Sequence, residues 1–364
     1  MSGRQEAGGL RAARVARGWS QSEAARELVA LARAGGVPIA EAASLKTLLS
    51  RWENAHAVPD PQYRALLGEL YGRTPAELGI GGPPSDPDAA GSRGRLRAAL
   101  AAAADVDGAT LGLWREQLDV ATRLDDELGA AGAGELVRAM VERLDDTVRH
   151  VIGEPARAAV AAVLAPAAAL AGAQELDRGR PDLAWLRYHQ ARTAASEAGM
   201  LDEVAAAAAG QAAVLVDVDE AAAAVTLLES VEPDLRPGAR VPLAAARAIA
   251  LAASGDTAAA RLAIDAVLPA RLDAVRPRPA VELADLERWH GHTLATLGDT
   301  AAVGPLQRAL AAPPRSVRHR AALHADLALT LADEHPEDAA HHARAARDLA
   351  ERIGSERTQA RLRR

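Results

Sequence analysis

Short helix-breaking turns recur at nearly even intervals through the second half of this chain, and they constrain its fold more than any other feature. Measured at Arg180, Val218, Gly255, Gly298 and His335, successive turns are 38, 37, 43 and 37 residues apart. Each turn stands between two segments with helical periodicity, and the segment after it is rich in alanine. This repetition predicts a stacked array of helix pairs whose small side chains allow close approach.

Composition favours the same fold class. Aromatic residues make up 2% of the chain, Phe and Cys are absent, and hydrophobic residues reach 49%. The core must therefore be built from Ala, Leu and Val, which favours packing of helix on helix, and we expect an all-α protein of two or three domains. The absence of cysteine excludes disulfides and thiol chemistry and fits a reducing cytoplasm. We expect neither a signal peptide nor a membrane span, because no apolar run reaches about 20 residues.

Charge is unevenly distributed along the chain. Residues 1–80 carry ten Lys and Arg against eight Asp and Glu, a balance of +2, whereas the remainder carries −9. The only lysine and the only asparagine, Lys46 and Asn54, fall within nine residues of each other. The N-terminal part is therefore better suited than the remainder to approach a phosphate backbone.

Four helices are expected in residues 1–80. The first covers 4–17, the second runs from a capping box at Ser20 and Glu23 to about residue 33, and the third covers about 44–54. A fourth follows Pro59 and Pro61. A helix carrying Lys, Thr, Ser and Arg on one face, as the third does, is suited to a DNA groove.

These segments resemble the lambda-repressor-like, or XRE-type, helix-turn-helix family over about residues 8–79. The residues that carry the resemblance are Leu10-Arg11, Arg14, Gly18-Trp19-Ser20-Gln21, Ala24-Ala25, Ser50-Arg51-Trp52-Glu53-Asn54 and Val58-Pro59-Asp60. The sequence departs from the family in two ways. About a dozen extra residues lie around 30–43, where we expect a loop or a short extra helix, and Ala55 stands where the family prefers Gly.

The resemblance implies a role for each matching residue. The implied roles are base reading for Lys46, Thr47 and Arg51, phosphate binding for Gln21, Ser20 and Ser50, and a structural ion pair between Arg14 and Glu53. Gln21 is also expected to brace the third helix, and Trp52 to lie in the core. Lys46 and Arg51 suit guanine O6 and N7, and Thr47 suits a thymine methyl group or a phosphate. The alternative interpretations are solvated charges for Lys46 and Arg51 and a plain helix-start residue for Gln21.

Beyond the first domain, we expect a flexible Gly/Pro linker at 81–94, a helical cap or dimerisation region at 95–154, and a repeat domain at 155–364. The repeat domain resembles tetratricopeptide arrays, with LGD, SGD and RGRPD at its turns. That resemblance implies a superhelix with a groove for a peptide, a protein or a small molecule. The whole layout resembles a family of actinobacterial transcriptional regulators.

Two sets of residues beyond the first domain have more than one interpretation. The candidate groove residues are Trp185, Tyr188, His189, Arg192, Trp289 and His292, although Trp185 and Trp289 also fit a core between repeats. The apolar stripe of the first helix after the linker fits a cap on the array or a dimer contact. Its members are Leu111, Trp114, Leu118, Ala121, Leu124 and Leu128.

No pattern for catalysis is found. The chain has no Walker loop, no GxSxG and no HExxH, and we expect no enzyme, cofactor or metal site. The pairs His290/His292 and His341-His342 are interpreted as solvated or turn-packing residues, and Asp125-Asp126 as part of a solvated helix face.

Two hypotheses of different classes remain. The first is a cytoplasmic, sequence-specific regulator that binds double-stranded DNA as a homodimer and senses an effector through its repeats. The second is a protein-interaction scaffold whose helix-turn-helix no longer reads DNA. The long loop, Ala55 and the acidic remainder favour the second.

Overall fold

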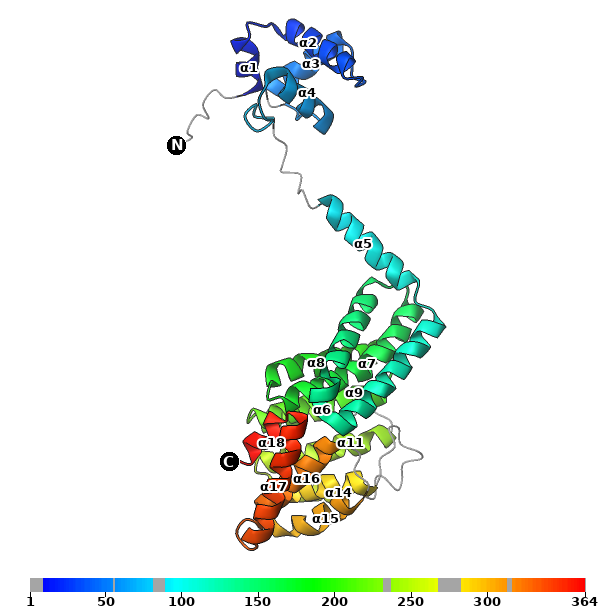
Figure 1. Cartoon of the computed structure of the whole chain (residues 1–364), viewed down its shortest axis with the longest axis vertical. Helices are drawn as coiled ribbons and strands as arrows, with labels where there is room; N and C mark the ends of the chain where they lie inside the picture. The colour runs from blue at the N-terminus through cyan, green and yellow to red at the C-terminus, as the bar shows by residue number, and fades with distance from the viewer. Residues whose placement is uncertain are drawn as a thin grey trace. The chain divides into compact units, whose positions relative to one another are not determined.

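The computed structural model describes residues 9–54, 56–80, 89–231, 237–267, 283–312 and 316–363. All regular secondary structure in these ranges is helical, which confirms the all-α prediction. The chain divides into two compact units, Met1–Leu96 and Arg97–Arg364, and each is described separately. Figure 1 labels most of the helices.

Among the described residues before α5, the first unit is built from four helices. They are α1 (Leu10–Ala16), α2 (Gln21–Ala34), α3 (Ala42–Glu53) and α4 (Pro61–Tyr71). Ser20 and Glu23 form the predicted capping box at the start of α2, and Asp60 caps α4 by accepting from the Tyr63 amide at 3.0 Å. Leu28, Leu45, Leu49 and Leu67 are fully buried at the centre of its core. These side chains hold the four helices together.

The extra residues between the second and third helices form a loop, without an additional helix. α2 continues to Ala34, and α3 begins at Ala42. The loop is fastened to α4, because the Ala40 amide donates to the Tyr63 hydroxyl at 3.1 Å and Gln62 donates to the Pro38 carbonyl at 2.8 Å. Ala55, the expected site of an altered helix end, lies outside the described residues.

Helix α5 (Ala89–Ala104) starts inside the segment for which a linker was predicted. Residues 81–88, which hold the prolines of that segment, lie outside the described residues. From Ala89 onward the composition turns to Ala, Arg and Leu, and these residues favour helix strongly enough to tolerate Gly91 and Gly94. The prediction of a linker is therefore wrong for 89–94.

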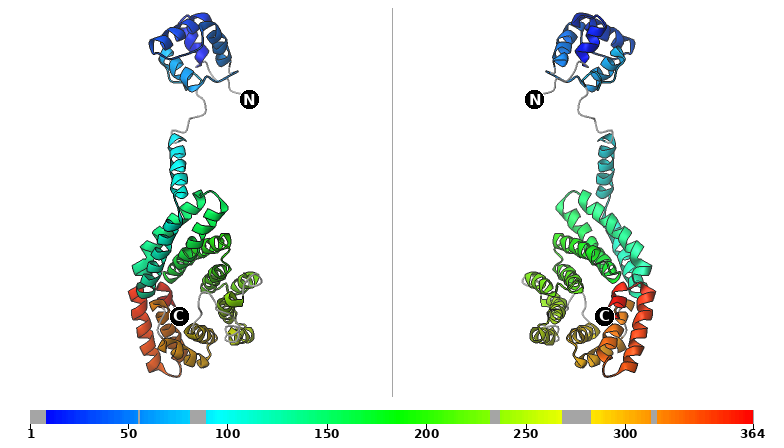
Figure 2. Two further views of the ribbon diagram at one scale, coloured as in Figure 1. Left: turned by 90° about the vertical axis from the view of Figure 1, so that its right-hand side faces the viewer. Right: turned by 90° about the vertical axis from the view of Figure 1, so that its left-hand side faces the viewer.

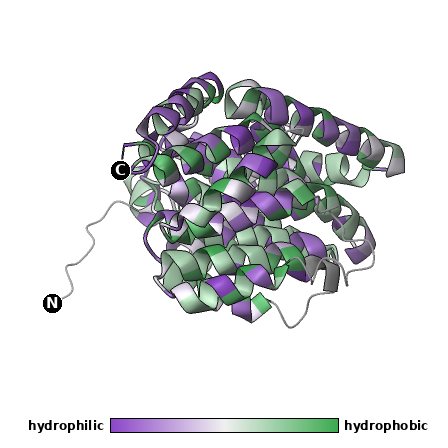
Figure 3. Cartoon of the chain, turned by 90° about the horizontal axis from the view of Figure 1, so that it is seen from below, coloured by the Kyte–Doolittle hydropathy of each residue, from purple (hydrophilic) through white to green (hydrophobic). Residues whose placement is uncertain are grey.

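The second unit is a succession of antiparallel helix pairs. After α6 (Gly108–His150) these are α7 (Glu154–Asp177) with α8 (Pro181–Glu197), α9 (Leu201–Asp217) with α10 (Ala221–Val231), α11 (Pro237–Ala253) with α12 (Thr257–Asp265), α14 (Leu283–Thr296) with α15 (Val303–Ala311), and α16 (Val317–Leu331) with α17 (Pro336–Ile353). A 3-10 turn, η2 (Thr300–Ala302), precedes α15, and α18 (Glu356–Arg361) follows α17. All five turns predicted from the sequence separate the two helices of a pair. Hydrophobic and hydrophilic residues alternate around these helices (Figure 3).

The helix pairs curve until the last of them meets α6 (Figure 2). Helix α6 changes direction at Gly129, which has φ 63° and ψ −161°. A β-carbon at Gly129 would lie 2.5 Å from the β-carbon of Ile353 at the end of α17, so only glycine permits this approach. Arg352 donates to the Glu127 carbonyl beside the same contact. The array is therefore closed by contacts between α6 and α17.

Helix α7 bears on the expectation that the chain has no membrane span. Of the helices in the described ranges, it alone is long and apolar enough, at 24 residues, to cross a membrane by length and composition. Val160, Leu164 and Ala168 on this helix are buried in a core cluster shared with α6 and α8. A buried core helix meets the same criteria, so α7 is weak support for a span.

Tyr188 requires small neighbours at one position in particular, and we predict that Gly210→Ala destabilises the second unit. A β-carbon at Gly210 would lie 2.2 Å from the Tyr188 ring, which is 8% exposed and surrounded by packed helices. We expect a loss of about 1–3 kcal/mol, as for other overpacked cores. Urea denaturation measures this loss. Gly112→Ala is the matched control: nothing lies within 4 Å of the added carbon, and alanine in a helix should leave stability unchanged or raise it.

Candidate nucleic-acid interface and a buried polar network

An ion pair connects the first and third helices of the first unit. The Arg14 guanidinium donates from Nε to Glu53 Oε1 at 2.6 Å and from Nη2 to Oε2 at 3.0 Å. Arg14 also donates to the Trp19 carbonyl at 2.7 Å. Only 2% of the Glu53 side chain is exposed. Burial alone would raise the pKa of Glu53, but hydrogen bonds from Arg14 and Gln21 outweigh burial and lower it.

Helix α3 presents opposite faces to the core and to solvent. Leu45, Leu49 and Trp52 are buried, whereas Lys46, Thr47 and Arg51 are exposed. At about 100° per residue, these two sets project from opposite sides of the helix. The structure thus brings the three predicted base-reading residues together on one accessible face. Ser50 lies on the same face and is partly buried.

The start of α2 supports α3 through Gln21. Its amide donates to Glu53 Oε2 at 2.9 Å, so Gln21 joins the ion pair that fixes the end of α3. That nitrogen has a second hydrogen available for a phosphate. Ser20 Oγ accepts from the Glu23 amide at 3.2 Å as the cap of α2, and it too retains a hydroxyl proton to donate. Gln21 and Ser20 therefore stabilise α3 and α2 respectively, and each still has one hydrogen-bond donor for a phosphate.

The chain was compared with known proteins. No protein-family model, no curated protein and no solved structure matched it.

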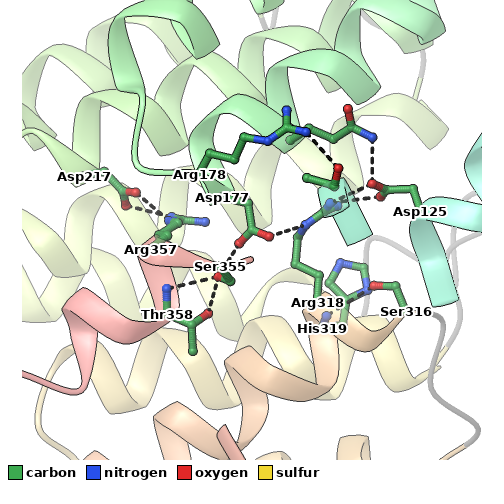
Figure 4. A network of polar contacts seen from close by, with 12 residues as sticks. Asp125, Asp177, Arg178, Asp217, Ser316, Arg318, His319, Ser355, Arg357 and Thr358 are labelled. Atoms are coloured by element: carbon green, nitrogen blue, oxygen red, sulfur yellow. Dashed lines mark hydrogen bonds and ion pairs between the residues drawn. The ribbon is translucent and has the colours of Figure 1, made fainter. Parts of the chain in front are cut away.

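A buried polar network occupies the interior of the second unit (Figure 4). Arg318 of α16 donates from Nη2 to Asp125 of α6 at 2.9 Å and from Nε to Asp177 of α7 at 3.2 Å. Gln174 donates to Asp125 at 2.8 Å. Burial opposes the charge of Arg318, but the two carboxylates outweigh burial and raise its pKa. These contacts join α6 to the first and the last helix pairs of the array.

The segment after α17 supplies the other half of this network. Ser355 Oγ donates to Asp177 Oδ1 at 2.6 Å, and Arg357 donates from Nη2 to Asp217 Oδ1 of α9 at 2.7 Å. Arg361 donates to Asp326 of α16, which also accepts from His292 Nδ1 at 2.9 Å. Burial would raise the pKa of Asp326, but the charges of His292 and Arg361 hold it well below the usual range. α18 is thus held at three carboxylates.

The six candidate groove residues do not form one site. Tyr188 is in the core with Leu176 and Val214, where burial raises its pKa to about 12. Trp289 packs beside Ile264 in another cluster, as the core interpretation predicted. Trp185 is 36% exposed, so the core interpretation is wrong for this residue. His189 is exposed and Arg192 is partly buried, with no hydrogen bond between them and His292 in the described structure. Helices α8 and α14 belong to different helix pairs, which separates the two groups.

The apolar stripe at the start of α6 is divided between core and surface. Leu118 and Ala121 are buried, and Leu111 and Trp114 pack against the same cluster. Leu124 and Leu128 are 37% and 46% exposed. The first four members therefore cap the array.

Sequence reasoning missed the carboxylates of the network. Asp125 was interpreted as solvated, and this is wrong, because Asp125 is 1% exposed and paired with Arg318. For two other carboxylates of the network, the sequence did contain a signal of burial. Asp177 and Asp217 are the last residues of α7 and α9, where a negative charge is unfavourable in the helix dipole. Acidic residues at such positions indicate partners elsewhere in the fold.

His324 and His342 contact each other within the second unit. Nδ1 of His324 lies 2.9 Å from Nδ1 of His342, so one ring donates and the other accepts. Within the part of the chain that the structure describes, no group of three or more His, Cys, Asp or Glu is placed to hold a metal ion.

This histidine pair predicts acid sensitivity of the second unit. Burial, with His342, Arg320 and His341 nearby, lowers the pKa of His324 from 6.5 to about 4. Between these values the unfolded chain binds a proton that the folded chain does not, so stability is full above pH 6.5 and falls as pH drops toward 4. Urea denaturation at several pH values measures this slope. His324→Leu should flatten it, exposed His189→Leu should leave it unchanged, and equal slopes in all three proteins would contradict the prediction.

Proposed function

We propose that this chain is a sequence-specific DNA-binding transcriptional regulator. In this proposal the first unit is an XRE-type helix-turn-helix domain, and α3 enters the major groove. The observation that carries the proposal is the exposed face of α3, where Lys46, Thr47 and Arg51 project together while Leu45 and Trp52 anchor the other face. Arg and Lys suit guanine, and a helix of this width fits the major groove.

Preorganisation of α3 supports the same proposal. The ion pair of Arg14 with Glu53, braced by Gln21, fixes the C-terminal end of α3 against α1 and α2. A recognition helix held in this way loses little conformational freedom on binding. The base-reading side chains remain free to reach base edges, and Ser20 and Gln21 each retain a donor for the adjoining phosphates.

We further propose that the second unit is a tetratricopeptide-like array that responds to a partner or effector and supports a homodimer. A single small domain of this kind reads few base pairs, and two copies would add the specificity of paired half-sites. The regular alternation of helices and turns in the array supports the repeat assignment. The proposed location is the cytoplasm, at the nucleoid.

Salt dependence of duplex binding tests this function. The full-length chain should bind a mixture of random duplexes, and the logarithm of its association constant should fall linearly with that of the salt concentration. The slope reports the number of phosphates contacted. Absence of binding at low salt would refute the proposal and favour a protein-interaction scaffold. The net negative charge of the second unit fits a scaffold, because a negative surface repels the phosphates of DNA.

A further inference from the structure

The segment containing α18 is held in the array without contributing to its apolar core. Its apolar residues, Ala360 and Leu362, are only partly buried, and neither belongs to a core cluster of the described chain. The buried residues of this segment are the polar Ser355 and Thr358. An element that folds as part of a core is normally held by apolar burial, so this segment is attached in a different way.

The attachment is made of charged hydrogen bonds to one surface. We define the inner acidic surface as Asp177, Asp217 and Asp326, which come from α7, α9 and α16. Each of the three accepts from a different residue of the segment, namely Ser355, Arg357 and Arg361. Arg357 and Arg361 are four residues apart, so they project from one face of a helix. Donors and acceptors thus match along the whole segment.

The connection to α17 makes the segment a structural element separate from that helix. Gly354 ends α17 in a left-handed conformation, with φ 70°, and α18 turns away from the α17 axis. If the segment left, Asp217 would lose the two hydrogen bonds from Arg357, and Asp326 would retain only His292. An uncompensated buried carboxylate is costly, so a vacant surface would favour any helix offering the same charges.

We propose that the inner acidic surface is a binding site for an α-helical peptide bearing two arginines four residues apart, and that residues 355–363 occupy it in cis. The site recognises the arginines with Asp217 and Asp326, and Asp177 recognises a hydroxyl two residues before the first arginine. A peptide of the same chemistry on another protein competes with α18 for the surface. This proposal is independent of DNA binding, and its test contains no DNA.

A unique label reports whether the segment is bound. The chain has no cysteine, so Arg363→Cys, at an exposed position beside α18, takes a nitroxide at that position alone. The label should be immobilised in the otherwise unaltered chain and mobile in Arg357→Ala/Arg361→Ala. Arg347→Ala, which removes an exposed arginine of α17, is the matched control and should leave the label immobilised. A label equally mobile in all three proteins would overturn the proposal.

Binding in trans tests the site itself. A fluorescent peptide of residues 354–363 should bind Arg357→Ala/Arg361→Ala saturably, and the unaltered chain about tenfold more weakly or less, because a tethered segment competes at high effective concentration. Equal binding to both proteins, or to neither, would refute the proposal. If circular dichroism shows that the double variant has lost helix content, a displacement experiment on the otherwise unaltered, spin-labelled chain takes its place. Excess unlabelled peptide should then displace residues 355–363 and make the nitroxide mobile. A nitroxide that stays immobilised would overturn the proposal.

Discussion

Glu53→Ala is expected to unfold the first unit, or nearly so, at room temperature. Glu53 accepts from Arg14 and Gln21 in a site where 11% of the Arg14 side chain and 2% of its own are exposed. Removing one partner of a buried ion pair leaves the other charge without compensation, which costs about 3–5 kcal/mol. Small domains have a total stability of roughly 5–15 kcal/mol. This one substitution therefore removes much of what holds α1, α2 and α3 together.

Urea denaturation of the first unit, followed by Trp19 and Trp52 fluorescence, measures this loss. Glu27→Ala removes an exposed carboxylate from α2 and is the matched control, for which we expect a change within about 0.5 kcal/mol. Similar denaturation midpoints for the two variants would show that the ion pair does not stabilise the fold.

The ion pair also makes the stability of the first unit depend on pH. Because the pKa of Glu53 is lowered in the folded state, stability is full above its unfolded value of 4.5 and falls with further acidification.

Arg51→Ala is expected to abolish preference for one base pair while leaving the fold intact. Its side chain is exposed on α3 and makes none of the hydrogen bonds that hold the helix. If Arg51 donates to guanine O6 and N7, its removal costs about 1–3 kcal/mol of discrimination at that position. Adding Lys46→Ala should remove a second contact and reduce specific affinity further.

Selection from a pool of randomised duplexes measures this preference directly. The Arg51→Ala variant should show a flat base distribution at one position of the selected motif. Arg123→Ala, which removes an exposed arginine from α6 in the other unit, should select the same motif as the unaltered chain. An unchanged motif from Arg51→Ala would show that Arg51 is not a base-reading residue.

The sequence predicted the elements of this fold better than their connections. Local signals were sufficient for the capping box at Ser20, the five turns of the array and the buried face of α3, because each depends on residues close in the chain. The start of α5 at Ala89 was missed because Gly and Ser within it were given more weight than the surrounding helix formers. Propensity summed over a longer window favours the helix.

Long-range contacts could not be predicted from local patterns. The pair of Arg14 and Glu53 was expected only through a family resemblance. The pairing of Asp125 with Arg318 joins residues 193 positions apart, and no periodicity indicates it. Closure of the array at Gly129 and Ile353 likewise depends on the summed curvature of many helix pairs. Charged residues on amphipathic helices are most often solvated, which is why the inner acidic surface was overlooked.

Recovery of genome fragments by the purified full-length chain tests the central claim most directly. The claim is that α3 reads a DNA sequence through Lys46 and Arg51. The account predicts enrichment of a few fragments sharing a motif, and loss of this enrichment with Lys46→Ala/Arg51→Ala while the helix content stays unchanged. Equal recovery of fragments by both proteins, or no enrichment by either, would contradict it.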